Sequence, residues 1–154
     1  MNADVFRRIE LLRAWLEASP ERFIAGELPS GNPSPPEEAQ RAGYAEFLRH
    51  CDGGRFGPID FFGGAQLPFE QGPADLWRDA VGDALVVGSY LSDPMVLREN
   101  GLFKLVALDS AQLQPLGSLG EFLEVLVGPG YLALFADAAE DPWGQALAAA
   151  GLLA

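Results

Sequence analysis

The chain has 154 residues, of which 49% are hydrophobic and 21% are charged, and Cys51 is its one cysteine. This composition fits a single folded domain, excludes a disordered chain and leaves no intrachain disulfide. The net charge is −12, and residues 51–154 hold 14 of the 22 acidic residues but 4 of the 10 basic ones. Such a charge repels nucleic acid and anionic membranes and attracts basic partners, although acidity also serves solubility alone.

The first predicted element is an amphipathic helix that begins at Asp4, a suitable N-cap, and ends before Pro20. Its apolar face is formed by residues at helical spacing, namely Val5, Ile9, Leu12 and Leu16. The start of the chain lacks the apolar core of a signal peptide, so we expect a cytoplasmic protein. A loop rich in proline and glycine follows over 28–36, and Ser34 and Glu37 then have the spacing of a capping box.

The most informative segment is the helix predicted next, together with the two glycines that follow it. Its apolar positions, spaced i, i+3, i+4 and i+7, are Tyr44, Phe47, Leu48 and Cys51. Gly53 and Gly54 are expected at positive φ, where they would stop the helix. His50 and Cys51 point about 100° apart on a helix. We therefore interpret Cys51 as a buried core residue and not as a nucleophile activated by His50.

The middle of the chain is predicted to be rich in strands. Residues 55–62 are aromatic and contain Gly57 and Pro58, which indicates an irregular or edge strand. The Asn100-Gly101 pair is typical of a type I′ hairpin turn. We expect further strands over 84–91, 95–98, 102–108 and 112–116.

Short helices complete the pattern. One is expected over 73–81, and a second is expected after Ser118, with Leu119, Phe122, Leu123 and Leu126 on its apolar face. Residues 128–130 interrupt the second helix, 131–138 resume it, and Pro142 opens a terminal helix. The whole pattern predicts an α+β fold, as a single domain over 1–154 with a mainly antiparallel central sheet flanked by N- and C-terminal helices.

One motif resembles a known family. The order Tyr-x-x-Phe-Leu-x-x-x-(Asp/Asn)-Gly-Gly is formed here by the structural signature residues Tyr44, Phe47, Leu48, Gly53 and Gly54. It resembles the signature of the SUKH superfamily, and further matching pieces are Pro35-Pro36, the segment 85–108 and the Ser-Leu-x-x-Phe-Leu helix that starts at Ser118. The resemblance is strongest over 33–127. An N-terminal helix within 1–30 precedes it, and a C-terminal helical extension over 129–154 follows.

The resemblance implies a non-enzymatic immunity protein that binds and neutralises a cognate polymorphic toxin, for which a basic nuclease is one candidate. The alternative is a cytoplasmic scaffold or regulator similar to the fungal cell-wall synthesis regulators of the same superfamily. A third hypothesis is an enzyme with an acidic site, for which Asp79 and Asp83 offer a carboxylate pair four residues apart. A solvated helix face explains that pair better.

The expected partner is a basic protein domain, with no nucleic acid, membrane, cofactor or metal involved. His50 is the only histidine, and no glycine-rich segment is followed by the Lys-Ser/Thr of a phosphate-binding loop. Phenylalanines near the glycines of 53–64 are expected in the core, and an exposed one would be an interface anchor. The residues predicted at the interface are Asp60, Asp75, Trp77, Asp79 and Asp93.

Overall fold

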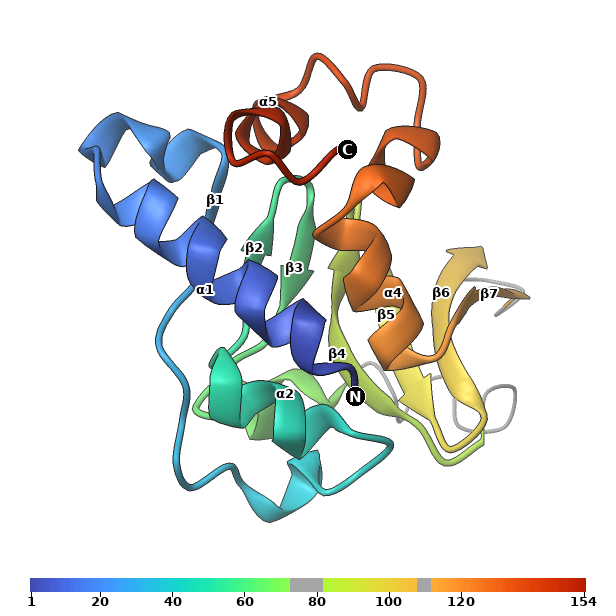
Figure 1. Cartoon of the computed structure of the whole chain (residues 1–154). Coiled ribbons are helices and arrows are strands. Elements are labelled where there is room, and N and C mark those ends of the chain that lie inside the picture. Colours follow the sequence, from blue (N-terminus) through green and yellow to red (C-terminus); the bar gives the residue numbers. More distant parts are fainter. Residues whose placement is uncertain (73–81, 108–111) are drawn as a thin grey trace.

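The computed structural model describes residues 1–72, 82–107 and 112–154 (Figure 1). Seven strands in this part of the chain form one antiparallel sheet in the order β1-β2-β3-β4-β5-β6-β7, so that each strand pairs with its neighbours in sequence. The strands are β1 (Gly26–Glu27), β2 (Gly54–Phe56), β3 (Ile59–Phe61), β4 (Leu85–Tyr90), β5 (Asp93–Arg98), β6 (Gly101–Ala107) and β7 (Gln112–Gly117). This arrangement confirms the predicted α+β fold with an antiparallel sheet.

Helices pack against one face of that sheet, which we call the inner face, and Figure 1 shows α1 and α4 lying across it. The α-helices are α1 (Ala3–Glu17), α2 (Tyr44–His50), α4 (Leu119–Leu126) and α5 (Pro142–Ala149). Short 3-10 helices are η1 (Pro20–Ile24), η2 (Glu37–Ala39), η3 (Leu67–Glu70) and η4 (Pro129–Ala133). No helix in the described ranges is long and apolar enough to cross a membrane.

The predicted signature helix is confirmed as α2, and its apolar stripe is fully buried. Phe47 packs against Phe61 of β3, with ring centroids 5.3 Å apart. The Tyr44 hydroxyl donates a hydrogen bond to the carbonyl oxygen of Phe62 at 2.5 Å, and its oxygen also lies 3.3 Å from the carbonyl oxygen of Val87. This stripe therefore joins α2 to the loop after β3 and to β4, which are distant from it in sequence.

The two glycines after α2 have the predicted positive φ, +78° for Gly53 and +137° for Gly54, but their predicted role is wrong. The helix already ends at Cys51, whose backbone is extended with φ −154° and ψ 114°. Gly53 is required by close packing instead, because a Cβ there would lie 2.7 Å from the carbonyl oxygen of Phe61.

Two predicted helix caps are also wrong. The N-cap of α1 is Asn2, whose side chain accepts a hydrogen bond from the backbone N–H of Asp4. Asp4 instead lies in the first turn, where its carboxylate pairs with Arg7 and Arg8 and complements the helix dipole. The predicted capping box at Ser34 does not form, because η2 starts after an uncapped Pro36.

The hairpin turns differ from their predicted positions. β2 and β3 are interior strands and not edge strands, because each pairs with a neighbouring strand on both sides. Gly57 and Pro58 lie in the turn between these two strands and not inside a strand. Left-handed residues close the β4–β5 hairpin instead, with φ +47° at Leu91 and +74° at Ser92. The predicted type I′ turn at Asn100-Gly101 is wrong, since Asn100 has no positive φ and Gly101 belongs to β6.

The predicted starts of the two C-terminal α-helices are confirmed. Ser118 caps α4 through a capping box with Glu121, and Pro142 lies in the first turn of α5 behind the N-cap Asp141. The chain after Gly128 resumes as the 3-10 helix η4 and not as an α-helix. The helix predicted over 73–81 lies outside the described residues.

Candidate functional site

The outer face of the sheet, opposite the helices, carries a row of polar residues across four strands. Glu27 of β1 pairs with Arg55 of β2, Arg55 pairs with Asp60 of β3, and Asp60 pairs with Ser89 of β4. Directly paired residues of an antiparallel sheet project to the same face. The register therefore aligns these four residues, which we call the outer row.

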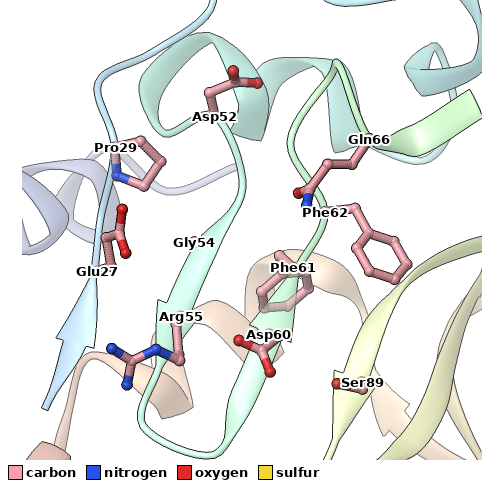
Figure 2. Close-up of a pocket in the computed structure, with 10 residues that line it drawn as sticks. All are labelled: Glu27, Pro29, Asp52, Gly54, Arg55, Asp60, Phe61, Phe62, Gln66 and Ser89. Carbon is pink, nitrogen blue, oxygen red and sulfur yellow. The ribbon is translucent and has the colours of Figure 1, made fainter. Parts of the chain in front are cut away.

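The outer row lines a concave pocket of about 410 Å³ (Figure 2). The other lining residues are Pro29, Asp52, Gly54, Phe61, Phe62 and Gln66. The pocket contains three carboxylates and one guanidinium. The guanidinium of Arg55 is turned toward β1 and donates to the backbone carbonyls of Phe23 and Ile24. The carboxylates therefore dominate the charge that faces the pocket.

Asp52 and Asp60 have different roles in this pocket. One carboxylate oxygen of Asp52 accepts hydrogen bonds from the backbone N–H of Gly64 and from the Asn32 amide, at 2.8 Å and 3.4 Å, so Asp52 holds two loops together. Within the described residues, Asp60 has no ion-pair partner within 4.0 Å. Partial burial raises the pKa of Asp60, an effect that Arg55 and a hydrogen bond from Ser89 partly oppose. Asp60 is thus available to meet a cation from outside.

The raised pKa of Asp60 predicts a pH-dependent gain of stability on substitution. A carboxyl group whose pKa is higher in the folded state than in the unfolded state destabilises the protein above the folded-state pKa. That penalty disappears as the pH falls below the unfolded value of about 3.9. We expect Asp60→Asn to raise the free energy of unfolding at pH 7 by less than about 1 kcal/mol, because water screens the partly exposed group. Urea unfolding between pH 3 and 7 measures this, and a loss of stability at pH 7 would contradict it.

The structure separates the sequence-predicted interface residues. Asp60 lies in the outer pocket, whereas Asp93 lies on the inner side, 3.9 Å from the Lys104 ammonium. The register explains the separation, because Ser89 of the outer row pairs with Pro94, which leaves Asp93 on the opposite face. Asp60 and Asp93 therefore do not share a face of the sheet. Asp75, Trp77 and Asp79 lie outside the described residues.

The sequence analysis did not predict several residues that line the pocket, namely Glu27, Asp52, Arg55, Gln66 and Ser89. A partial signal was present, since Arg55 and Asp60 alternate with apolar residues that point into the core. The sequence held no signal that Glu27 would pair with Arg55 or that Ser89 would pair with Asp60, because these pairs depend on strand register.

Other reactive groups are engaged in packing. Cys51 is fully buried, its thiol donates to the carbonyl oxygen of Gly53 at 3.0 Å, and burial raises its pKa to about 11. This confirms the interpretation of Cys51 as a core residue. His50 stacks on Phe6 with ring centroids 3.7 Å apart. Among residues 1–72, 82–107 and 112–154, no group of three or more His, Cys, Asp or Glu side chains is arranged to hold a metal ion.

Comparison with protein families, curated proteins and solved structures finds no match to this chain. The resemblance to the SUKH superfamily therefore rests on the signature residues and the order of elements alone.

Proposed function

We propose that this chain is a non-enzymatic immunity protein of the SUKH type that binds and neutralises a basic toxin domain in the cytoplasm. The observation that carries the proposal is the acidic pocket on the outer face of the sheet. Its walls are hydrogen-bonded strands, so it can meet a partner without reorganisation, which lowers the cost of binding. The resemblance of the α2 motif to the superfamily signature supports the same function.

The charge of the pocket favours a specific kind of toxin. An enzyme that cleaves nucleic acid must hold phosphate groups with lysine and arginine side chains. An acidic concave surface can pair with those side chains and so exclude the substrate. Asp60 and Glu27 would accept hydrogen bonds from an inserted guanidinium or ammonium group, which are the stronger, charge-assisted kind. The proposal accordingly includes no nucleic acid, membrane or cofactor as a partner.

Binding kinetics test which face contacts the toxin. We expect association to exceed the neutral range of about 10⁵–10⁶ M⁻¹s⁻¹ at low salt and to fall as salt rises. Asp60→Asn should slow association at low salt by roughly threefold and also speed dissociation, because it removes one charge from the contact surface. Asp93→Asn removes the same charge from the opposite face and is the matched control. Equal effects of the two substitutions would contradict binding through the outer face.

The biological test is co-expression. Proteins encoded beside this gene are expressed in a sensitive host, and the toxic ones are then co-expressed with this chain. The proposal expects that it protects the host from one of them and forms a one-to-one complex with that protein. Failure to protect against any toxic neighbour would count against immunity. A stable complex with a harmless neighbour would instead favour the scaffold hypothesis.

A further inference from the structure

A second concave surface is lined by residues of the β2–β3 turn, the β4–β5 turn and the start of α5. Figure 1 shows the β2–β3 turn at the end of the sheet pointing toward α5. The concave surface has a volume of about 250 Å³, and we call it the strand-end groove. Its apolar lining consists mainly of Ile24, Pro58, Leu91, Phe135, Pro142 and Trp143. It shares no lining residue with the acidic pocket of the outer face.

The strand-end groove continues along α5. A neighbouring hollow of about 300 Å³ is lined by Trp15 from α1 and by Ala146 and Ala149 from α5. Ile24 and Pro142 line both hollows, so the two form one continuous surface. This surface is apolar apart from Asp141 in the groove and Glu21, Arg22 and Gln145 in the second hollow. Apolar hollows of this kind are where interfaces place their anchoring side chains.

Leu91 lowers the stability of the isolated protein in two ways. Its backbone has a left-handed φ of +47°, in a two-residue turn where glycine, asparagine and aspartate are preferred. Its side chain is 52% exposed, and that of Ile24 is 62% exposed. Neither the backbone strain nor the exposed apolar surface stabilises the fold. A partner protein that bound at the groove would bury the exposed side chains of Leu91 and Ile24.

The charges around the strand-end groove indicate what the partner carries. The wall formed by 134–143 contains three acidic residues and no basic one. On the opposite wall, the Arg22 guanidinium stacks on Trp15 and donates to its carbonyl oxygen at 2.7 Å, while Arg55 donates to backbone carbonyls. Asp141 is the one charged residue that lines the groove, and its carboxylate accepts hydrogen bonds from the Tyr131 hydroxyl and the backbone N–H of Gly144. Asp137 and Glu140 of the same segment are exposed, so the net acidic charge of this wall favours a cationic occupant. A second copy of this chain, with its net charge of −12, would be repelled.

We infer that the strand-end groove binds a basic amphipathic segment of a protein partner, seating apolar side chains against Leu91 and Ile24 beneath flanking lysine or arginine residues. This contact goes beyond the outer-face proposal and stands if that proposal fails. It adds an apolar anchor, which sets the dissociation rate, to the charges that guide association.

The test uses the full chain and a helical peptide of two Leu-Lys-Lys-Leu-Leu-Lys-Leu repeats, with a second peptide in which every lysine is glutamate. We expect the lysine peptide to bind and the glutamate peptide not to bind, as measured by fluorescence anisotropy. Leu91→Asn should weaken lysine-peptide binding by about tenfold or more. The same substitution should raise the melting temperature by about 3 °C, because asparagine tolerates the left-handed conformation. If Leu91→Asn makes the protein more stable but bind the peptide more weakly, Leu91 serves docking and not the stability of the fold.

Two control variants locate the binding. Phe69→Asn removes an apolar side chain that is 86% exposed and lies outside the groove, and it should leave the affinity unchanged. Asp60→Asn probes the outer face, and it should weaken lysine-peptide binding less than Leu91→Asn does. The inference fails if the lysine peptide does not bind, if the glutamate peptide binds equally well, or if Leu91→Asn has no effect. Loss of binding in Asp60→Asn alone would overturn the inference while supporting the acidic pocket as the binding surface.

Discussion

Replacing Phe47 by alanine is expected to lower the free energy of unfolding by about 3–5 kcal/mol, which is a large part of the stability of an ordinary domain. Phe47 is fully buried, and its ring contacts the rings of Tyr44, Phe56 and Phe61 at centroid distances of 5.6, 6.5 and 5.3 Å. These residues come from three separate elements. Truncation therefore leaves a cavity where α2 meets β2 and β3, and close packing prevents the walls from collapsing fully.

Chemical denaturation of the two proteins measures the effect of Phe47→Ala. The matched control is Phe69→Ala, which makes the same chemical change at a side chain that is 86% exposed. We expect the control to change stability by less than about 0.5 kcal/mol. Similar losses for both variants would mean that Phe47 is not packed as the structure describes.

Replacing Gly53 by alanine is expected to destabilise the protein by about 3–5 kcal/mol, from the combined costs of left-handed backbone and overpacking. Gly53 has φ +78°, and a Cβ would meet the backbone N of Gly63, the carbonyl oxygen of Phe61 and the carbonyl carbon of Phe62. These are backbone atoms next to β3, so they cannot rotate away as a side chain would. The loop after α2 and the loop after β3 would have to separate, which disturbs the wall of the acidic pocket.

Gly151→Ala is the matched control for this prediction. Gly151 has nearly the same φ, +75°, but a Cβ there would have no atom within 4 Å. We expect it to cost only the backbone strain, about 1–2 kcal/mol. Thermal and urea unfolding of both variants separate strain from crowding, and equal losses would show that crowding at Gly53 is absent. The same Gly53→Ala variant should bind the proposed toxin domain more weakly.

We expect the acidic pocket and the strand-end groove to govern different steps of binding. Charges of the outer face act over distance and govern the rate of encounter, whereas apolar contacts in the groove act at close range and govern the lifetime of the complex. Because the two surfaces share no lining residue, single substitutions in each can be measured separately and then combined. Additive effects would indicate independent contacts with the partner.

The sequence by itself determined the elements whose signals are local. The spacing of Tyr44, Phe47, Leu48 and Cys51 identified the buried stripe of α2, because helical periodicity places these side chains on one face. Ser118 and Pro142 marked the starts of α4 and α5, since a cap or a first-turn proline acts within a few residues. The antiparallel sheet followed from the strand-rich middle of the chain with helices at both ends.

Tertiary structure alone decided which residues share a surface. Strand register places Glu27, Arg55, Asp60 and Ser89 in one row and sends Asp93 to the other face, and a shift of one residue would reverse this. Packing also overrode local preference, because Leu91 has a left-handed φ in the β4–β5 turn, whereas Asn100 in the β5–β6 turn lacks the left-handed φ that the sequence predicted for it. Register and turn geometry depend on the burial of whole strands against distant helices, and that contact energy exceeds the propensity of any one residue.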